Sequence, residues 1–398
     1  MKVTQLYTII NAVTKEVLGE TAVVNEDLSN VVDIGKAVID SVNGIDNYVR
    51  KLVDHIGKVV FVNRAYSGGV PSVLMDSWEF GSILEKISTD LPEATENDSW
   101  NLQDGEQYPQ DTFYQPKVEA KFFNSKVTFE IKLSFTEIQV KSAFSSAEQL
   151  NGFISMLVQS VENSMTVKTD ALIMRAINNM IAETLVSELG TGTAGSKVVN
   201  WEGSGVRAVN LLALYNATVT TPLTAAEAVI SPDFVRFATY QIALVSDRMS
   251  KISTLFNSGK KPRFTPDDMK RVVLLSDFAK ASDILLLSDT RNPDRITLPA
   301  HDTVPYWQGS GTDYALTSTG VIDVKTASGE TVKVPATASI IGVVFDRDAV
   351  GVANLDRRVT TAYNARAEFY TNFYKMDAGY YNDLSENFVV FFLGEDVA

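Results

Sequence analysis

Residues 360–392 read TTAYNARAEFYTNFYKMDAGYYNDLSENFVVFF, a segment rich in aromatic and β-prone side chains. Runs of this composition are typical of strands that pack against a buried surface. No nucleophile motif, metal-ligand spacing or phosphate-binding loop accompanies them. We expect a chain that places its bulkiest residues in long strands, without reactive groups, to work by surface contact rather than by chemistry.

The region before this tail predicts mixed α/β structure from about residue 206. Apolar runs at residues 271–275 and 283–287 indicate short buried strands or a strand–helix pair, and the run at 340–345 indicates a buried strand. Residues 231–233, with the sequence SPD, mark the start of a helix, because proline is favoured at the first helical position. Apolar residues then continue on one face of that helix.

The longest predicted element is a helix over residues 145–189. Ser145 and Glu148 fit a capping box, apolar residues then recur with helical spacing, and Gly190 provides a stop. A helix of roughly 40 residues extends about 60 Å at 1.5 Å per residue. Its apolar stripe keeps no strict heptad, so we expect a rigid beam rather than a coiled coil.

Two runs, residues 118–122 and 127–135, alternate apolar and polar side chains with a period of two. Asn124 and Ser125 lie between them and predict a hairpin turn. A two-stranded ribbon is marginal alone in water, so it should pack either within its own domain or on a neighbouring subunit. The segment before it, residues 76–116, is acidic and interrupted by prolines.

Composition excludes several kinds of site. The 398-residue chain has no cysteine and only two histidines, His55 and His301, which rules out disulfides and a histidine-rich zinc site. A carboxylate site for magnesium or calcium stays open. The net charge of −14 argues against a protein that binds DNA by neutralising its phosphates. It is compatible with a wall that surrounds DNA without binding it. No signal peptide or membrane span is visible in the sequence.

Two short motifs invite a chemical interpretation. Residues 190–195, GTGTAG, match the dinucleotide-binding pattern, but they follow a helix instead of opening one, so we expect a helix-stop loop. Asp346 and Asp348 flank Arg347 without a nearby nucleophile or general acid. Solvated or intersubunit ion pairs are the better interpretation of these aspartates.

Taken in order, these elements resemble the major capsid proteins of tailed double-stranded DNA phages, which have the Hong Kong 97-like fold. The most specific local match begins at residues 341–352, IGVVFDRDAVGV, and continues through the aromatic tail. The resemblance covers nearly the whole length and implies an α+β fold with four parts. These are an N-terminal arm (1–70), an extended β-hairpin loop (71–135), a peripheral domain with the spine helix 145–189 (136–205 and 354–384), and an axial α/β domain (206–353 and 385–398).

The resemblance also implies a function. Such a protein self-assembles through hexamers and pentamers into an icosahedral or prolate shell that encloses the phage genome. It needs no catalysis, cofactor or metal, and it encloses DNA without sequence-specific binding. Expected partners are further copies of itself, a separate scaffolding protein and a portal. Its expected place is the virion capsid, after assembly in the cytoplasm of the bacterial host.

Charge segregation along the chain suggests contact residues between subunits. We expect the acidic loop of one copy, which would lie over the adjacent subunit, to meet basic residues of that neighbour. The acidic and aromatic candidates are Trp78, Glu93, Asp98, Trp100 and Asp104. The basic candidates are Lys117, Lys121, Arg357, Arg358 and Arg366.

Two other classes remain open at this point. An encapsulin-like compartment shares the same fold, and a tail component is another self-assembling structural protein. An enzyme that uses carboxylates, and in some cases magnesium, would instead show one deep pocket with convergent acidic residues.

Overall fold

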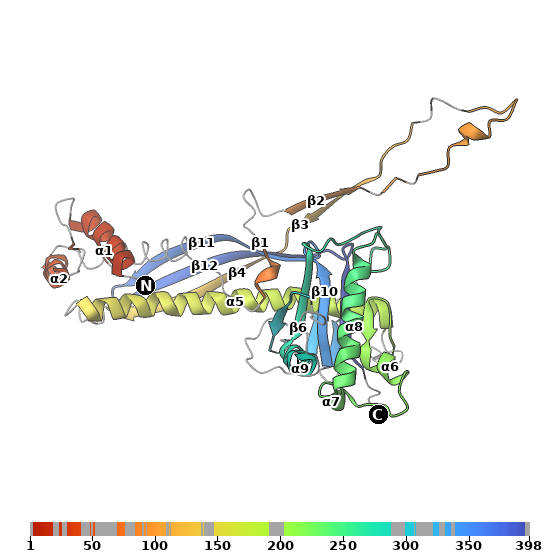
Figure 1. The fold of residues 1–398 in the computed structure, drawn as a ribbon. Coiled ribbons are helices and arrows are strands. Elements are labelled where there is room, and N and C mark those ends of the chain that lie inside the picture. The colour runs from red at the N-terminus through yellow and green to blue at the C-terminus, as the bar shows by residue number, and fades with distance from the viewer. Residues whose placement is uncertain are drawn as a thin grey trace. The chain divides into compact units, whose positions relative to one another are not determined.

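The computed structural model combines helices and strands, so the α+β prediction is confirmed (Figure 1). The residues that it describes are 3–18, 24–25, 30–40, 48, 51, 70–75, 84–89, 91–92, 94–108, 111, 113–136, 138, 147–190, 203–287, 299–305, 307, 321–325, 331–335 and 339–394. The chain divides into two compact units. The first comprises Met1–Glu79, Lys126–Ile173 and Val352–Gly379, and the second comprises Phe80–Ser125, Met174–Gly351 and Tyr380–Ala398.

The described helices and strands follow the order expected of the Hong Kong 97-like fold. The helices are α1 (Val3–Leu18), α2 (Val31–Asp40), α5 (Ala147–Leu189), α6 (Leu211–Asn216), α7 (Ala225–Ala228), α8 (Pro232–Met249) and α9 (Ser276–Leu287), with 3₁₀ turns η1 (Pro71–Val73) and η2 (Asp98–Trp100). The strands are β1 (Leu74–Met75), β2 (Leu84–Thr89), β3 (Val118–Phe123), β4 (Lys126–Thr136), β5 (Ala208–Asn210), β6 (Lys270–Leu275), β7 (Asp302–Val304), β8 (Val321–Lys325), β9 (Thr331–Pro335), β10 (Ser339–Asp346), β11 (Val350–Asn364), β12 (Phe369–Asn382) and β13 (Phe388–Leu393).

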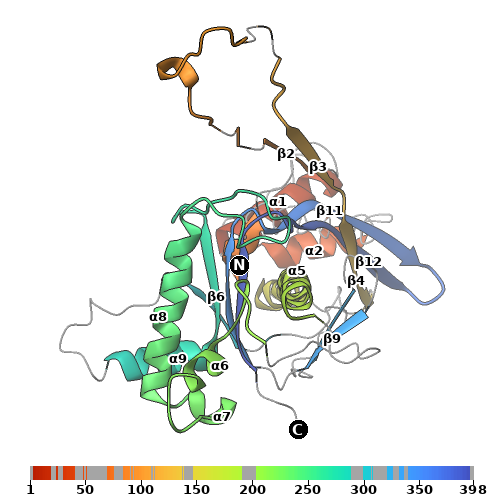
Figure 2. The ribbon, with the colours of Figure 1, turned by 90° about the vertical axis from the view of Figure 1, so that its right-hand side faces the viewer.

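Helix α5 confirms the predicted long helix. It is 43 residues long, which corresponds to about 65 Å, and Figure 2 shows it end-on. Gly190 follows it with a φ of 70°, a left-handed conformation that glycine adopts without strain. Ser145, the predicted cap, lies outside the described residues, as do residues 191–195 of the glycine-rich motif.

The first unit contains a four-stranded sheet in the order β1-β11-β12-β4. Strands β12 and β4 are antiparallel in unbroken register from Phe369 opposite Thr136 to Gly379 opposite Lys126. Alternate residues of β12 are buried, among them Tyr370, and the ring of Tyr370 stacks on that of Phe135 with 5.6 Å between centroids. The aromatic tail therefore forms strands that pack on a buried face, as its composition predicted.

The second unit is built on a five-stranded sheet in the order β5-β13-β10-β6-β7. All six residues of β13 are buried, and this strand lies between β10 and β5. Helices α6, α8 and α9 contribute apolar side chains to the same core. The predicted strands at 271–275 and 340–345 and the helix start at Pro232 are confirmed.

The predicted hairpin at Asn124 and Ser125 is wrong. Strand β3 pairs with β2, from Leu84 opposite Phe123 to Thr89 opposite Val118, whereas β4 pairs with β12. Residues 124–125 therefore join strands of two different sheets. An alternating pattern defines which face of a strand is apolar, but it does not define the neighbouring strand, and β12 offers β4 a longer apolar face than β3 could.

Candidate assembly site at the extended loop

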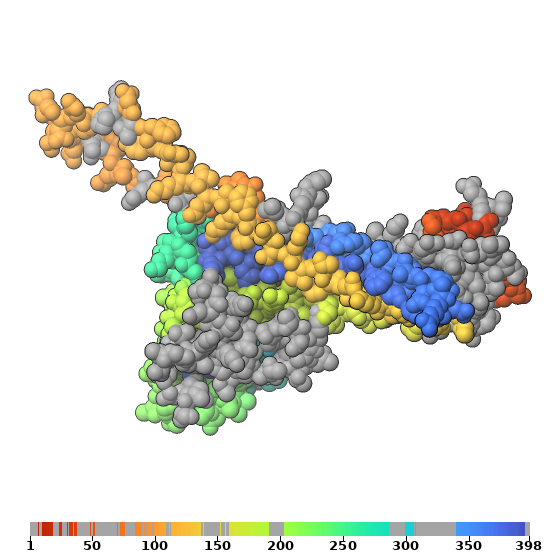
Figure 3. Space-filling view, turned by 180° about the vertical axis from the view of Figure 1, so that it is seen from behind, coloured from red at the N-terminus to blue at the C-terminus, as the bar shows by residue number. Residues whose placement is uncertain are grey.

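The loop between β2 and β3 exposes large apolar side chains. Trp100 is 95% exposed, Phe113 85% and Tyr114 84%, and Leu91, Leu102 and Tyr108 are exposed as well. The described parts of the loop extend away from the two strands (Figures 1 and 3). Exposed apolar residues are ordinary when single, but so many on one loop mark an interaction surface.

The two strands at the foot of the loop, β2 and β3, form an antiparallel ribbon with one partly buried and one exposed face. Partners directly opposite in an antiparallel pair point to the same side. One face, which includes Lys86 opposite Lys121, is partly buried. The other face carries Ile87 and Phe122, each 64% exposed, and Val118 at 57%. The partly buried face thus holds both lysines together with apolar residues, and three large apolar side chains face solvent on the other side.

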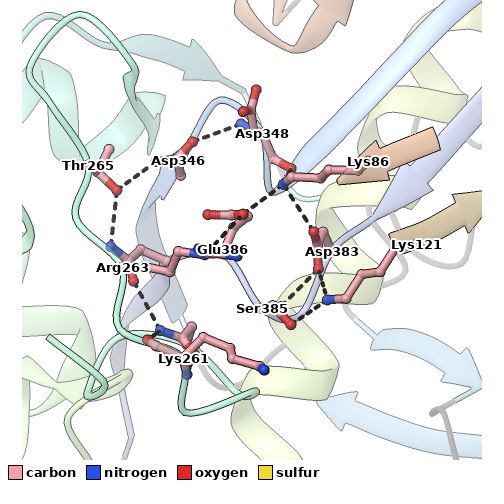
Figure 4. A network of polar contacts seen from close by, with 12 residues as sticks. Lys86, Lys121, Lys261, Arg263, Thr265, Asp346, Asp348, Asp383, Ser385 and Glu386 are labelled. Carbon is pink, nitrogen blue, oxygen red and sulfur yellow. Dashed lines mark hydrogen bonds and ion pairs between the residues drawn. The ribbon is translucent and has the colours of Figure 1, made fainter. Parts of the chain in front are cut away.

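Both inward-facing lysines bind the turn between β12 and β13 (Figure 4). The Nζ of Lys86 lies 3.0 Å from Oδ2 of Asp383 and 2.7 Å from Oε1 of Glu386. The Nζ of Lys121 lies 2.9 Å from Oδ1 of Asp383 and also donates to Oγ of Ser385. One carboxylate, Asp383, therefore accepts from both strands of the ribbon.

Two further ion pairs surround this network. The Nε of Arg263 lies 3.5 Å from Oε1 of Glu386, and the Nζ of Lys261 lies 3.0 Å from Oε1 of Glu119 on β3. The segment 261–263 therefore contacts both the β12–β13 turn and the ribbon through opposite charges.

The β12–β13 turn is itself fixed by hydrogen bonds. The backbone N–H of Ser385 donates to Oδ1 of Asp383 at 3.0 Å, and the N–H of Asp383 donates to the carbonyl of Ala349 at 2.8 Å. Hydrogen bonds that do not involve the extended loop therefore hold Asp383, the acceptor shared by both lysines, in place.

Asp346 was predicted to form a solvated or intersubunit ion pair, but the structure gives it a different role. Its side chain is buried, Oδ2 accepts from the hydroxyl of Thr265 at 2.7 Å, and Oδ1 accepts from the N–H of Asp348 at 2.9 Å. A short carboxylate that accepts a backbone N–H two residues on stabilises a tight turn. Asp346 is therefore a structural turn residue.

The charges of the network shift several pKa values. Burial raises the pKa of Asp383, but its hydrogen bond to Lys121 and the charge of Lys86 outweigh that effect, so the net pKa is lowered. Burial lowers the pKa of Lys86, but the hydrogen bond to Glu386 and the charge of Asp383 reverse this, so its net pKa is raised. For Glu386 burial dominates and raises the pKa. The ionised lysines and Asp383 thus stabilise one another.

The comparison with known protein families decides the class. The model of the Phi29-like phage major capsid protein family matches residues 10–392. The chain belongs to this family. A major capsid protein is a structural component, so the predictions of a phage capsid protein and of a non-enzyme are confirmed, and the encapsulin-like, tail and enzyme alternatives are not supported.

One curated major capsid protein and several solved capsid structures are similar to this Phi29-like capsid protein at low sequence identity. It is 25% identical over 187 residues to the major capsid protein of Bacillus phage GA-1, an alignment that spans 46% of this chain and 38% of that relative. The capsid structure of Staphylococcus phage Andhra is 9% identical, with a TM-score of 0.49 and coverage of 83% of this chain and 86% of the other. For the capsid structure of Cyanophage P-SCSP1u the corresponding values are 12%, 0.45, 84% and 92%.

The capsid protein's predicted contact residues lie in different environments. On the loop, Trp100, Asp104 and Lys117 are exposed, whereas Trp78 and Glu93 lie outside the described residues and only the backbone of Asp98 is described. Contact with a neighbouring copy stays a prediction for these residues.

Two of the basic candidates, Lys121 and Arg358, pair with carboxylates whose contacts the structure describes. Lys121 binds Asp383, and Arg358 lies 2.7 Å from Oδ2 of Asp377 on β12 and 3.0 Å from Oδ2 of Asp356. Arg366 is exposed in the turn after β11, and Arg357 is half-buried. The intrachain pairs occupy Lys121 and Arg358, and their predicted contact with a neighbour's loop stays untested.

Within the described part of this capsid protein, no group of histidine and acidic side chains has the arrangement of a metal site. None of the helices described here combines the length and apolarity that crossing a bilayer requires. Lys86, Asp383 and Glu386 are the residues that sequence reasoning missed. The available signal was the alternation of β2, which turns Lys86 to the same side as Leu84 and Ser88.

Proposed function

We propose that this capsid protein assembles into the icosahedral or prolate shell that encloses a phage double-stranded DNA genome, and that its extended loop supplies contacts between copies. One observation carries the proposal: Trp100, Phe113 and Tyr114 are each more than four-fifths exposed on a single loop of the chain. Aromatic anchors of this size dominate binding energy when a partner buries them. Further copies of the chain are the partner that a shell provides.

The proposed parts of the subunit follow the family's plan. Within it, residues 1–70 form the arm, 71–135 the extended loop, 136–205 and 354–384 the peripheral domain, and 206–353 and 385–398 the axial domain. Head-to-tail contacts between copies would give hexamers and pentamers. Such heterologous interfaces form a closed ring when successive rotations lead back to the first copy. Compact axial domains and long extended segments suit this arrangement.

The other partners follow from charge and from the family. At a net charge of −14 the shell would surround DNA without adhering to it, since the phosphates carry the same sign. A separate scaffolding protein and a portal would take part in assembly, in the cytoplasm of the bacterial host.

Truncation of the loop aromatics tests the proposal. In the triple variant Trp100→Ala, Phe113→Ala, Tyr114→Ala we expect the isolated subunit to keep its stability within about 0.5 kcal/mol per site, because exposed side chains contribute little to folding. Shells should be lost in electron micrographs and sedimentation profiles, recorded with and without a scaffolding protein.

The matched control is a second triple variant in the same loop, Asn101→Ala, Gln103→Ala, Gln107→Ala, which removes exposed polar side chains. It should assemble as the parent does. Normal shells from the aromatic variant would show that the loop does not supply the contacts.

A further inference from the structure

The ribbon formed by β2 and β3 contacts the rest of its unit through several ion pairs. The ribbon meets the rest of its unit through ion pairs of Lys86, Lys121 and Glu119, and through a tilted ring contact between Phe123 and Tyr381 with centroids 5.1 Å apart. The apolar residues Ile87 and Phe122 point away from these contacts. The contacts that hold the ribbon in place therefore include charged pairs to both of its strands.

We propose that Lys86, Lys121 and Asp383 form a positioning site that sets the direction of the extended loop. The inference rests on the proposed function, in which that loop contacts other copies. Asp383 divides its two carboxylate oxygens between the strands: Oδ2 takes Lys86 from β2 and Oδ1 takes Lys121 from β3. A single anchor with one contact to each strand fixes the rotation of the ribbon about its own axis as well as its attachment.

Secondary acceptors make the arrangement specific. Lys86 also reaches Glu386, and Lys121 also reaches Ser385, so each strand has two acceptors on one turn. These hydrogen bonds to charged groups are strong and directional, in contrast to apolar contacts, which tolerate sliding.

Burial adds a penalty for any other orientation. The side chain of Asp383 is only 3% exposed, and that of Glu386 10%. If the ribbon left this position, both carboxylates would lose their lysines in a site with little access to water. The network therefore selects one direction for the loop, and with it the place where Trp100 and Phe113 meet a partner.

The absence of native cysteine permits a direct test in the full chain. Spin labels at Asn101→Cys on the loop and Asp247→Cys on α8, both exposed positions of the same unit, report the distance between loop and body by double electron–electron resonance. The unassembled parent should give one narrow distance distribution. In the double variant Lys86→Met, Lys121→Met, which keeps most of the side-chain length but removes both charges, that single narrow peak should be lost.

Two variants serve as controls. Lys86→Arg keeps the charge and should keep the narrow peak. Lys117→Met removes an exposed lysine of the same segment, for which no ion pair is seen among the described residues, and should change nothing. Far-ultraviolet circular dichroism of each variant establishes that the rest of the chain is folded.

The outcomes separate this inference from the proposed function. An unchanged distance distribution in the double methionine variant overturns the positioning site, whatever happens to assembly. A lost peak together with a loss of shells supports both ideas. A lost peak with normal shells supports the positioning site and shows that assembly does not need a preset loop direction, while the aromatic triple variant decides the proposed function separately.

Discussion

At the scale of single residues, the most consequential group is the carboxylate of Asp383. It is almost completely buried, it ties two strands to one turn, and two lysines lower its pKa against the effect of burial. A buried charge is tolerated only while its partners are present. The free energy of folding should therefore depend on this side chain more than on any exposed ion pair nearby.

Replacement of Asp383 by asparagine should lower the free energy of unfolding at pH 7 by about 3 kcal/mol, because two lysines lose their countercharge. The folded pKa of Asp383 is below the ordinary value of 3.8. Its stabilisation is therefore fully present above that value and is lost as the pH falls through the folded pKa. Urea unfolding of the unassembled parent and variant should show the difference at pH 7 and a smaller one near pH 3.

The control for that measurement is Glu119→Gln, which breaks the pair with Lys261. Glu119 is half exposed, so solvent screens the interaction and the expected cost is about 0.5 kcal/mol. Equal losses from the two variants would contradict the role given to burial.

Residue types in the sequence pointed to the exposed residues of the extended loop, but not to the buried ion pairs at the foot of that loop. Trp100 and Asp104 stand out in an acidic, proline-interrupted loop, and the structure leaves both exposed. Lys86 and Asp383 are 297 residues apart in sequence, and their pairing depends on a turn whose place the sequence pattern did not reveal. Asp346 was misjudged for the same reason, since its burial comes from elements distant in sequence.

At the scale of elements, local periodicity predicted the helices and strands better than it predicted which strands pair with each other. Helix α5, the strands β6 and β10 and the start of α8 could be read from apolar spacing and from proline and glycine positions. The partner of β3 could not, because β2 lies beyond a long loop and its six residues have only a weak apolar pattern. Strand partners depend on long-range packing.

Glycine at position 342 of β10 is required by the close approach of β6. A Cβ there would meet Leu274 Cδ2 and lie 2.7 Å from the carbonyl oxygen of Val273. The substitution Gly342→Ala should therefore lower the free energy of unfolding by about 2 kcal/mol through overpacking, measured by denaturant unfolding of the isolated subunit.

Gly152 of α5 is the matched control, since a Cβ there meets nothing within 4 Å. Gly152→Ala should raise stability by up to about 1 kcal/mol, because alanine favours an exposed helix position. A neutral result at Gly342 would show that β10 and β6 can move apart without cost.

At the scale of the whole molecule, charge and assembly are linked. The chain carries a net charge of −14, and the extended loop is acidic and aromatic together. Such a surface favours a basic partner surface that also offers apolar contacts. Exposed cations on neighbouring copies, such as Arg366, would meet that requirement.

Reversal of the loop charge in Glu93→Lys, Asp98→Lys, Asp104→Lys should block assembly while the subunit stays folded, because like charges would then face each other across the contact. Sedimentation and electron microscopy measure assembly, and circular dichroism measures folding. The neutral variant Glu93→Gln, Asp98→Asn, Asp104→Asn should have a weaker effect. Shells of ordinary yield from the lysine variant would exclude charge attraction as a cause of the contact.

The position of β13 has a consequence for synthesis. It is the last of the five strands of its sheet to leave the ribosome, yet it lies between β10 and β5. Until residues 388–393 are available, β10 and β5 lack the strand that pairs with both of them. Completion of the sheet in the second unit must therefore wait for these residues, and polysome-bound fragments should not join a growing shell prematurely.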